Sequence, residues 1–147
     1  MPVPASPGQR LLAFLIDYVV LVLLLALLFA LSPLLPKTWF ATPGRAHLSS
    51  FLLLTLPVLL YFALLEGSSW QGTVGKRLRG LRVVDPAGRP PTRPRSLLRN
   101  GVKLAPWEIA HAFVHRVEVW PEAVVVGAGI AAMVLMAVFV ALVFAGP

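Results

Sequence analysis

Residues 11–32 read LLAFLIDYVVLVLLLALLFALS and contain one charged side chain, Asp17. Residues 123–144 read AVVVGAGIAAMVLMAVFVALVF and contain none. A helix of about 20 apolar residues is long enough to cross the ~30 Å hydrocarbon core of a bilayer. Both segments therefore predict transmembrane helices, and the fold class they predict is an all-α integral membrane protein.

The composition of the whole chain agrees with a membrane protein. Of its 147 residues, 58% are hydrophobic and 13% are charged, and the mean hydropathy is +0.82. A soluble domain has about 25% charged residues, so this composition excludes a soluble enzyme, a soluble nucleic-acid-binding protein and a disordered chain. The absence of cysteine excludes disulfides and thiolate metal sites.

The expected organisation is a short tail at residues 1–10 followed by a single membrane domain at residues 11–144. A further transmembrane helix is expected between the two apolar segments, at residues 48–65, where Pro57 predicts a kink. The first apolar segment does not fit a cleaved signal peptide. It is far longer than the ~7–15 residues of a signal hydrophobic core, and it contains Asp17.

Basic residues are concentrated in the loop after the second span. Nine of the 13 lysines and arginines fall between Lys76 and Lys103. Because basic loops remain in the cytoplasm, we expect a multi-pass protein of the cell (inner) membrane with the N-terminus and the loop at residues 66–103 cytoplasmic. This loop is expected to attract anionic lipid headgroups. We expect no nucleic acid partner, since residues 76–103 contain no aromatic side chain to stack on bases.

Residues 97–120 have an amphipathic pattern, with apolar and polar residues on separate helical faces. We expect a helix that lies in the membrane interface or is partly embedded, with Trp107 and Trp120 at the headgroup level. The alternative is a fourth element that crosses the membrane. Pro106 predicts a bend or a new helix start near Trp107.

The polar face of this helix carries two glutamates and two histidines at helical spacing, which are Glu108, His111, His115 and Glu118. Carboxylate and imidazole groups are ligands for zinc, iron or manganese. One helix rarely supplies a whole coordination sphere, so a polar face in contact with water or headgroups is the simpler interpretation. A proton relay through the histidines is a third. We expect no cofactor, with a divalent metal as the alternative.

Asp17 is the residue with the strongest physical argument for a role. A carboxylate in a membrane span costs roughly 2–3 kcal/mol on insertion scales, so it should face protein or water. It is either a contact that fixes helix packing, a cation or proton site, or a neutral acid that the fold tolerates. Arg10 lies seven residues earlier on nearly the same face, and Glu66 ends the second span on the same side of the membrane. Arg10 paired with Glu66 would join the two spans, and a Glu66 in interfacial water is the alternative.

Three blocks of sequence resemble the RDD family of membrane proteins. Residues 10–17 (RLLAFLID) resemble its first helix, residues 61–85 its second helix and the loop that follows, and residues 95–100 (RSLLRN) a third motif. The family is named after one arginine and two aspartates, which the resemblance places at Arg10, Asp17 and Asp85. The motif residues in and after the loop are Thr73, Gly75, Lys76, Gly80, Arg82, Asp85 and Arg99.

The resemblance leaves two functional hypotheses open. Transport of undefined ligands has been proposed for the family, and some members are linked to sodium–proton exchange. A eukaryotic relative resembles a membrane scaffold. The first hypothesis is a transporter or transporter subunit for cations or small solutes, with Asp17 as ion or proton carrier and Arg10 as its tuning charge. Three spans enclose no convincing pathway, so it would need a homo-oligomer or a partner membrane protein. The second is a non-transporting scaffold or assembly factor whose basic loop binds anionic lipid or an acidic partner. We do not expect an enzyme.

Overall fold

The computed structural model describes residues 5–85, 87–115 and 120–145, of which residues 136 and 139–145 are described by their backbone alone. Within these ranges the chain forms helices and their connections, and no β-strand. The predicted all-helical class is confirmed for the part of the chain that the structure describes.

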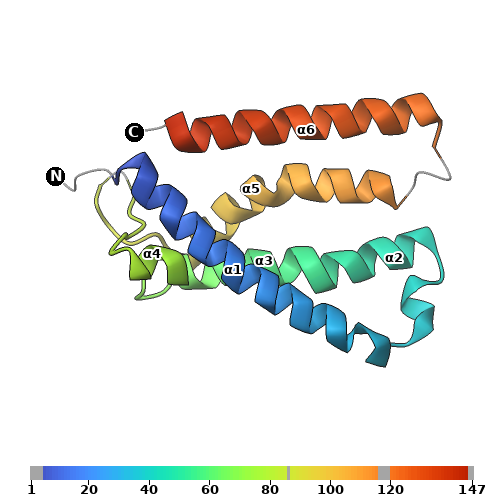
Figure 1. The fold of residues 1–147 in the computed structure, drawn as a ribbon, viewed down its shortest axis with the longest axis horizontal. Coiled ribbons are helices and arrows are strands. Elements are labelled where there is room, and N and C mark those ends of the chain that lie inside the picture. Colours follow the sequence, from blue (N-terminus) through green and yellow to red (C-terminus); the bar gives the residue numbers. More distant parts are fainter. Residues whose placement is uncertain (1–4, 86, 116–119, 146–147) are drawn as a thin grey trace.

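The first apolar segment forms α1 (Pro7–Leu31), the helix drawn in blue in Figure 1. It begins four residues before the predicted start because Ser6 and Gln9 form a reciprocal capping box. The helix is followed by two short 3₁₀ turns, η1 (Ser32–Leu34) and η2 (Lys37–Phe40), in a connection rich in proline.

The helix expected at residues 48–65 is longer than predicted and contains a π turn. It consists of α2 (Pro43–Ser50), the π turn η3 (Phe51–Thr55) and α3 (Leu56–Glu66), which follow one another without interruption. Pro57 cannot donate the backbone hydrogen bond of an ordinary α-helix, and the π turn ends two residues before it, at Thr55. The disturbance predicted at this proline therefore takes the form of a π turn inside a continuous helical segment.

Three more helices complete the fold, namely α4 (Val74–Leu78), α5 (Arg93–Val114) and α6 (Glu122–Ala145). α5 is the predicted amphipathic helix, although it begins and ends earlier than expected. Pro106 lies inside α5 and the helix continues through it, so the prediction of a new start near Trp107 is wrong. The last part of the predicted helix, residues 116–119, lies outside the described residues.

The long helices lie lengthwise beside one another (Figure 1). α5 contacts α3 on one side and α6 on the other, while the short α4 packs on α1. α4 lies at one end of the bundle, which we call the basic end, and α2 lies at the other, which we call the distal end. α5 therefore runs lengthwise along the bundle between α3 and α6.

Burial in this bundle is the reverse of that in a soluble protein. Large apolar side chains are widely exposed, including Phe29 at 76%, Leu34 at 80% and Met133 at 74%. Within the described ranges seven polar or charged side chains are buried, which are Asp17, Ser49, Thr55, Glu66, Thr73, Ser96 and Asn100. Among the described residues the buried hydrophobic ones are all alanines, namely Ala13, Ala63 and Ala132.

Two helical segments, Pro7–Leu34 and Pro43–Glu66, are long and apolar enough to cross a membrane. In α6 the fully described residues Glu122–Leu135 form an apolar helical stretch that is shorter than these two segments. Together with the reversed burial, these segments indicate a membrane location.

Candidate functional site

Asp17 is buried at the contact between α1 and α4, with 2% of its surface exposed. Its Oδ1 accepts the hydroxyl of Tyr61 and the backbone N–H of Gly75, both at 2.7 Å. Its Oδ2 accepts the hydroxyl of Thr73 at 2.5 Å. Three donors, from α3, from α4 and from the N-cap of α4, therefore satisfy both side-chain oxygens of Asp17, as a buried polar group requires.

The sequence of α4 explains this close approach. Thr73 is its N-cap, and the same hydroxyl that donates to Asp17 accepts the backbone N–H of Lys76. A Cβ on Gly75 would lie 2.0 Å from the carbonyl oxygen of Ala13 and 2.9 Å from Cγ of Asp17. Only glycine fits at this position, so the α1–α4 contact depends on a residue without a side chain.

Glu66 is the second buried carboxylate of the basic end, with 0% of its surface exposed. Lys76 binds its Oε1, while Arg99 and the Asn100 amide bind its Oε2, the latter at 2.8 Å. The amide of Asn100 also donates to the backbone oxygen of Ser96, one turn earlier on α5. This carboxylate therefore joins α3, α4 and α5 at one point.

The two carboxylates act on neighbouring positions of the same short helix. Thr73 and Gly75 contact Asp17, whereas Lys76 contacts Glu66. α4 is thereby held from both sides, by α1 and by the α3–α5 pair. This arrangement fixes the start of the basic loop relative to the bundle.

Asp85 organises a separate turn within the loop. Its Oδ1 accepts the backbone N–H groups of Ala87 and Arg89, both at 2.9 Å, and its Oδ2 lies 3.3 Å from the guanidinium of Arg89 and 3.8 Å from that of Arg95. The backbone N–H of Arg89, that of Ala87 and the Arg89 charge hold the pKa of Asp85 below its usual value. Asp85 thus closes the turn that leads into α5.

The structure brings together some of the predicted site residues and separates others. Asp17, Thr73 and Gly75 form one cluster, and Glu66, Lys76 and Arg99 form the other. Gly80 has a left-handed φ of +68° in the turn after α4, and Arg82 is exposed. In the described part of the chain, Oε1 of Glu66 binds Lys76, and Oε2 binds Arg99 and Asn100. Glu66 is also sealed from solvent, so the alternative of a carboxylate in interfacial water is wrong.

The sequence did not predict three residues of these clusters, namely Tyr61, Ser96 and Asn100. Tyr61 opens the second block of family resemblance, and Ser96 and Asn100 lie four residues apart in the third block. That spacing places them on one helical face, which is the signal that was available for the second pair.

The candidate metal ligands of α5 bind different partners in the structure. Glu108 accepts the hydroxyl of Thr55 at 2.5 Å and lies 2.8 Å from Nε2 of His47, while His115 lies 2.8 Å from the hydroxyl of Ser50. His111 instead contacts the backbone oxygen of Trp107. Glu118 lies outside the described residues, and among those described no three histidine, aspartate or glutamate side chains are grouped as metal ligands.

The sequence model of the RDD family matches residues 4–146. The chain belongs to the RDD family. The match extends well beyond the three blocks of resemblance and includes α5 and α6. No curated protein and no solved structure matched the chain.

Four of the residues that carry the resemblance to the RDD family make defined contacts in this chain. Thr73 and Gly75 bind the aspartate of the first helix, and Lys76 and Arg99 bind the glutamate at the end of the second. The arrangement can hold a basic segment rigidly at one end of a helical bundle. It leaves no oxygen of Asp17 without a protein donor.

Proposed function

We propose that this RDD protein is a multi-pass protein of the cell membrane that acts as a scaffold, with a basic cytoplasmic segment that binds anionic lipid headgroups. The observation that carries the proposal is the coordination of Asp17 by Tyr61, Thr73 and Gly75. An acid whose two oxygens are bound by protein donors suits a structural contact better than a site that must bind and release an ion.

The reversed burial supports insertion of the whole bundle in a bilayer. Apolar side chains on the outside are stable in lipid, and polar side chains within a membrane face the protein interior. The basic end carries the N-terminal part of α1, α4 and the start of α5, so the rule that basic loops stay in the cytoplasm orients this end inward.

Exposed arginines of the basic end form the proposed lipid-binding surface, and these are Arg77, Arg79, Arg82, Arg89, Arg93 and Arg95. Arg77 lies over the ring of Trp70 at 5.3 Å, and this tryptophan is 44% exposed. A basic residue near an anionic surface contributes about 1 kcal/mol to binding. Because α4 is held by two carboxylates, several of these charges are presented in a fixed arrangement.

The surface can be tested with spin-labelled lipids in reconstituted membranes. We expect spin-labelled phosphatidylglycerol to be selected over phosphatidylcholine at the protein surface, and the selectivity to fall toward unity in Arg77→Gln/Arg79→Gln/Arg82→Gln. The matched control is Lys37→Gln/Arg45→Gln at the distal end, which should leave the selectivity unchanged. Equal selection of both lipids by the unmodified protein would refute lipid binding by this surface.

A second candidate function, cation–proton exchange, is favoured by the titratable cluster at the distal end. Glu108 on α5 lies against His47 and Thr55 of the α2–η3 segment, and the rings of His47 and His115 are 5.8 Å apart. Polar titratable groups inside a membrane bundle are common in proton pathways. In this hypothesis Glu108 or Asp17 would carry the proton.

Proton flux in proteoliposomes, driven by Na⁺, K⁺ or Li⁺ gradients, separates the two functions. Exchange would require flux in the unmodified protein and its loss in a folded Glu108→Gln or Asp17→Asn variant. Under the scaffold proposal we expect no flux above that of empty liposomes, and Asp17→Asn should change stability instead.

A further inference from the structure

The basic end contains a cluster of cations that the protein itself neutralises incompletely. Lys76 and Arg99 both bind the single carboxylate of Glu66, and Lys103 lies one helical turn beyond Arg99 on α5. Because residues four apart on a helix share one face, Lys103 lies on the same side of α5 as Arg99, and the four charged residues form one group. Three positive charges are therefore set against one negative charge.

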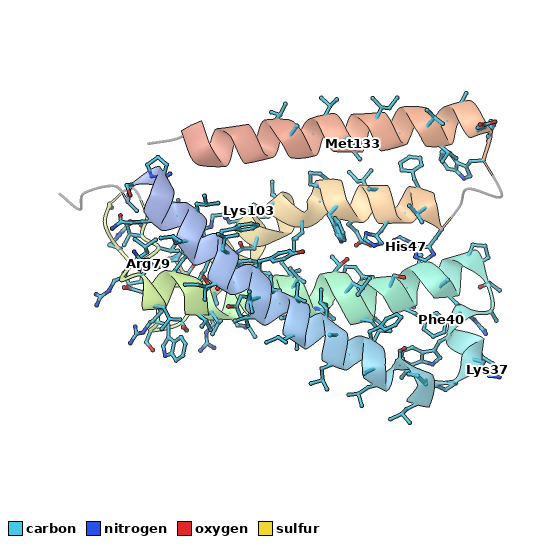
Figure 2. The ribbon with its side chains drawn as sticks, in the orientation of Figure 1. Lys37, Phe40, His47, Arg79, Lys103 and Met133 are labelled. Carbon is cyan, nitrogen blue, oxygen red and sulfur yellow. The ribbon has the colours of Figure 1, made fainter. Side chains whose placement is uncertain are left out.

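The cations lie nearer to the surface than the acid that they bind. The Glu66 side chain is fully buried, whereas the side chain of Lys76 is 28% exposed and that of Arg99 is 38% exposed. Lys103 is half-buried on the same helix (Figure 2). The positive charges of the group therefore lie toward the surface, and the Glu66 carboxylate is buried behind them.

Some nitrogen atoms of this group have no acceptor in the described part of the chain. Lys103 makes no hydrogen bond or ion pair there, and the buried Nε of Arg99 has no hydrogen-bond partner. A partly buried cation without a counter-charge is destabilised by desolvation. An additional acceptor with negative charge would therefore stabilise the arrangement.

The other described acids cannot supply that charge. Asp17 is bound by Tyr61, Thr73 and Gly75, and Asp85 is bound by Arg89 and Arg95. The remaining described acids, Glu108 and Glu122, lie toward the distal half of α5 and at the start of α6. A bound anion would supply the missing counter-charge.

We propose that Lys76, Arg99 and Lys103 form a binding site for a phosphate group at the basic end of the bundle. A guanidinium with its fork of N–H donors and two ammonium groups match the oxygens of a tetrahedral oxyanion. The phosphate belongs either to an anionic lipid headgroup or to free inorganic phosphate. The site shares no residue with the proposed lipid-binding surface, so the two proposals can be tested independently.

The test is a thermal-unfolding titration of the purified chain in a neutral detergent. The probes are inorganic phosphate, with chloride of equal ionic strength as its control, and dioctanoyl phosphatidylglycerol, with dioctanoyl phosphatidylcholine as its control. A saturable rise in Tm with either probe supports the site, because a ligand that binds the folded state stabilises it. A response to phosphatidylglycerol alone assigns the phosphate to a lipid, and a response to both assigns recognition to the phosphate group itself. No rise beyond the controls with either probe overturns the proposal.

Variants of Lys103 locate the site, since this residue makes no contact with Glu66 that its loss would break. We expect Lys103→Met to weaken the binding of the active probe by about tenfold or more, the loss of one charge-assisted hydrogen bond. Lys103→Arg retains the charge and should bind within a few-fold of the unmodified protein. The surface variant Arg77→Gln/Arg79→Gln/Arg82→Gln should also retain binding. Unchanged binding in a folded Lys103→Met variant, or equal loss in the surface variant, would place the anion elsewhere and overturn the proposal.

Discussion

Asp17 accepts the backbone N–H of Gly75 at 2.7 Å, which joins the first long helix directly to the backbone of α4. The contact connects two parts of the chain 58 residues apart. Because α4 begins the basic loop, the position of that loop relative to α1 depends on this carboxylate and on the absence of a side chain at residue 75, while Glu66 holds α4 from the other side.

Gly75→Ala should therefore separate α4 from α1. A Cβ 2.0 Å from the Ala13 carbonyl oxygen must displace one backbone or the other, and we expect a loss of about 3 kcal/mol, the upper range for overpacking. Equilibrium unfolding in mixed micelles measures this loss. Gly101→Ala is the control, since a Cβ at Gly101 in α5 would meet no atom within 4 Å. That variant should be as stable as the parent or slightly more stable, and equal stability of Gly75→Ala would show that the contact is not required.

Thr73→Val should lower stability by about 1.5–3 kcal/mol, because it removes a hydrogen bond to a charged group and leaves Oδ2 of Asp17 without its described donor. Thr73→Ser keeps the hydroxyl and should recover most of that loss. The same unfolding measurement applies to both variants. If serine and valine were equally destabilising, the hydroxyl would not be the group that matters.

Glu66→Gln should be among the most destabilising single changes in the chain. It removes the one negative charge between Lys76 and Arg99, and breaking a buried ion pair costs about 3–5 kcal/mol. Combination with Arg99→Gln should be less than additive, since the two residues share one contact. Glu122→Gln, in the first turn of α6, is the control and should change stability by less than ~0.5 kcal/mol.

The turn at Asp85 should depend on pH only in acid. Its pKa is lower in the folded chain than the unperturbed value of 3.8, so its contribution to stability is fully present above pH 3.8 and is lost as the pH falls through the lower folded pKa. Amide ¹⁵N–¹H chemical shifts of Ala87 and Arg89 in micelles should be constant from pH 7 to 5 and change below pH 3.8. A change centred near neutral pH would contradict this assignment.

The sequence predicted the elements of this fold better than their contacts. The long apolar segment at residues 11–32 required a helix whatever it packed against, and α1 spans Pro7–Leu31. Asp17 stood out because an acid in such a segment is costly. Its donors could not be predicted, because Tyr61 and Thr73 are 44 and 56 residues away and local periodicity carries no information about such pairs.

The placement of α5 illustrates the same limit. Its amphipathic pattern fits a helix in the interface and equally a helix whose polar face contacts other polar helices. Ser96 and Asn100 are fully or nearly fully buried, and Glu108 contacts the α2–η3 segment. These residues of its polar face are bound by protein groups, which the pattern of one helix does not distinguish from contact with water.

The central claim is that Asp17 holds α4, and with it the basic segment, in a fixed position on the bundle. The chain has no cysteine, so spin labels can be attached at two introduced cysteines, at the exposed positions Leu12 on α1 and Arg79 directly after α4. Double electron–electron resonance in lipid nanodiscs then measures the distance distribution between the labels. We predict one narrow distribution in the labelled parent and a broad one when Asp17→Ala is added. An equally narrow distribution, at the same distance, in the Asp17→Ala background would contradict the account.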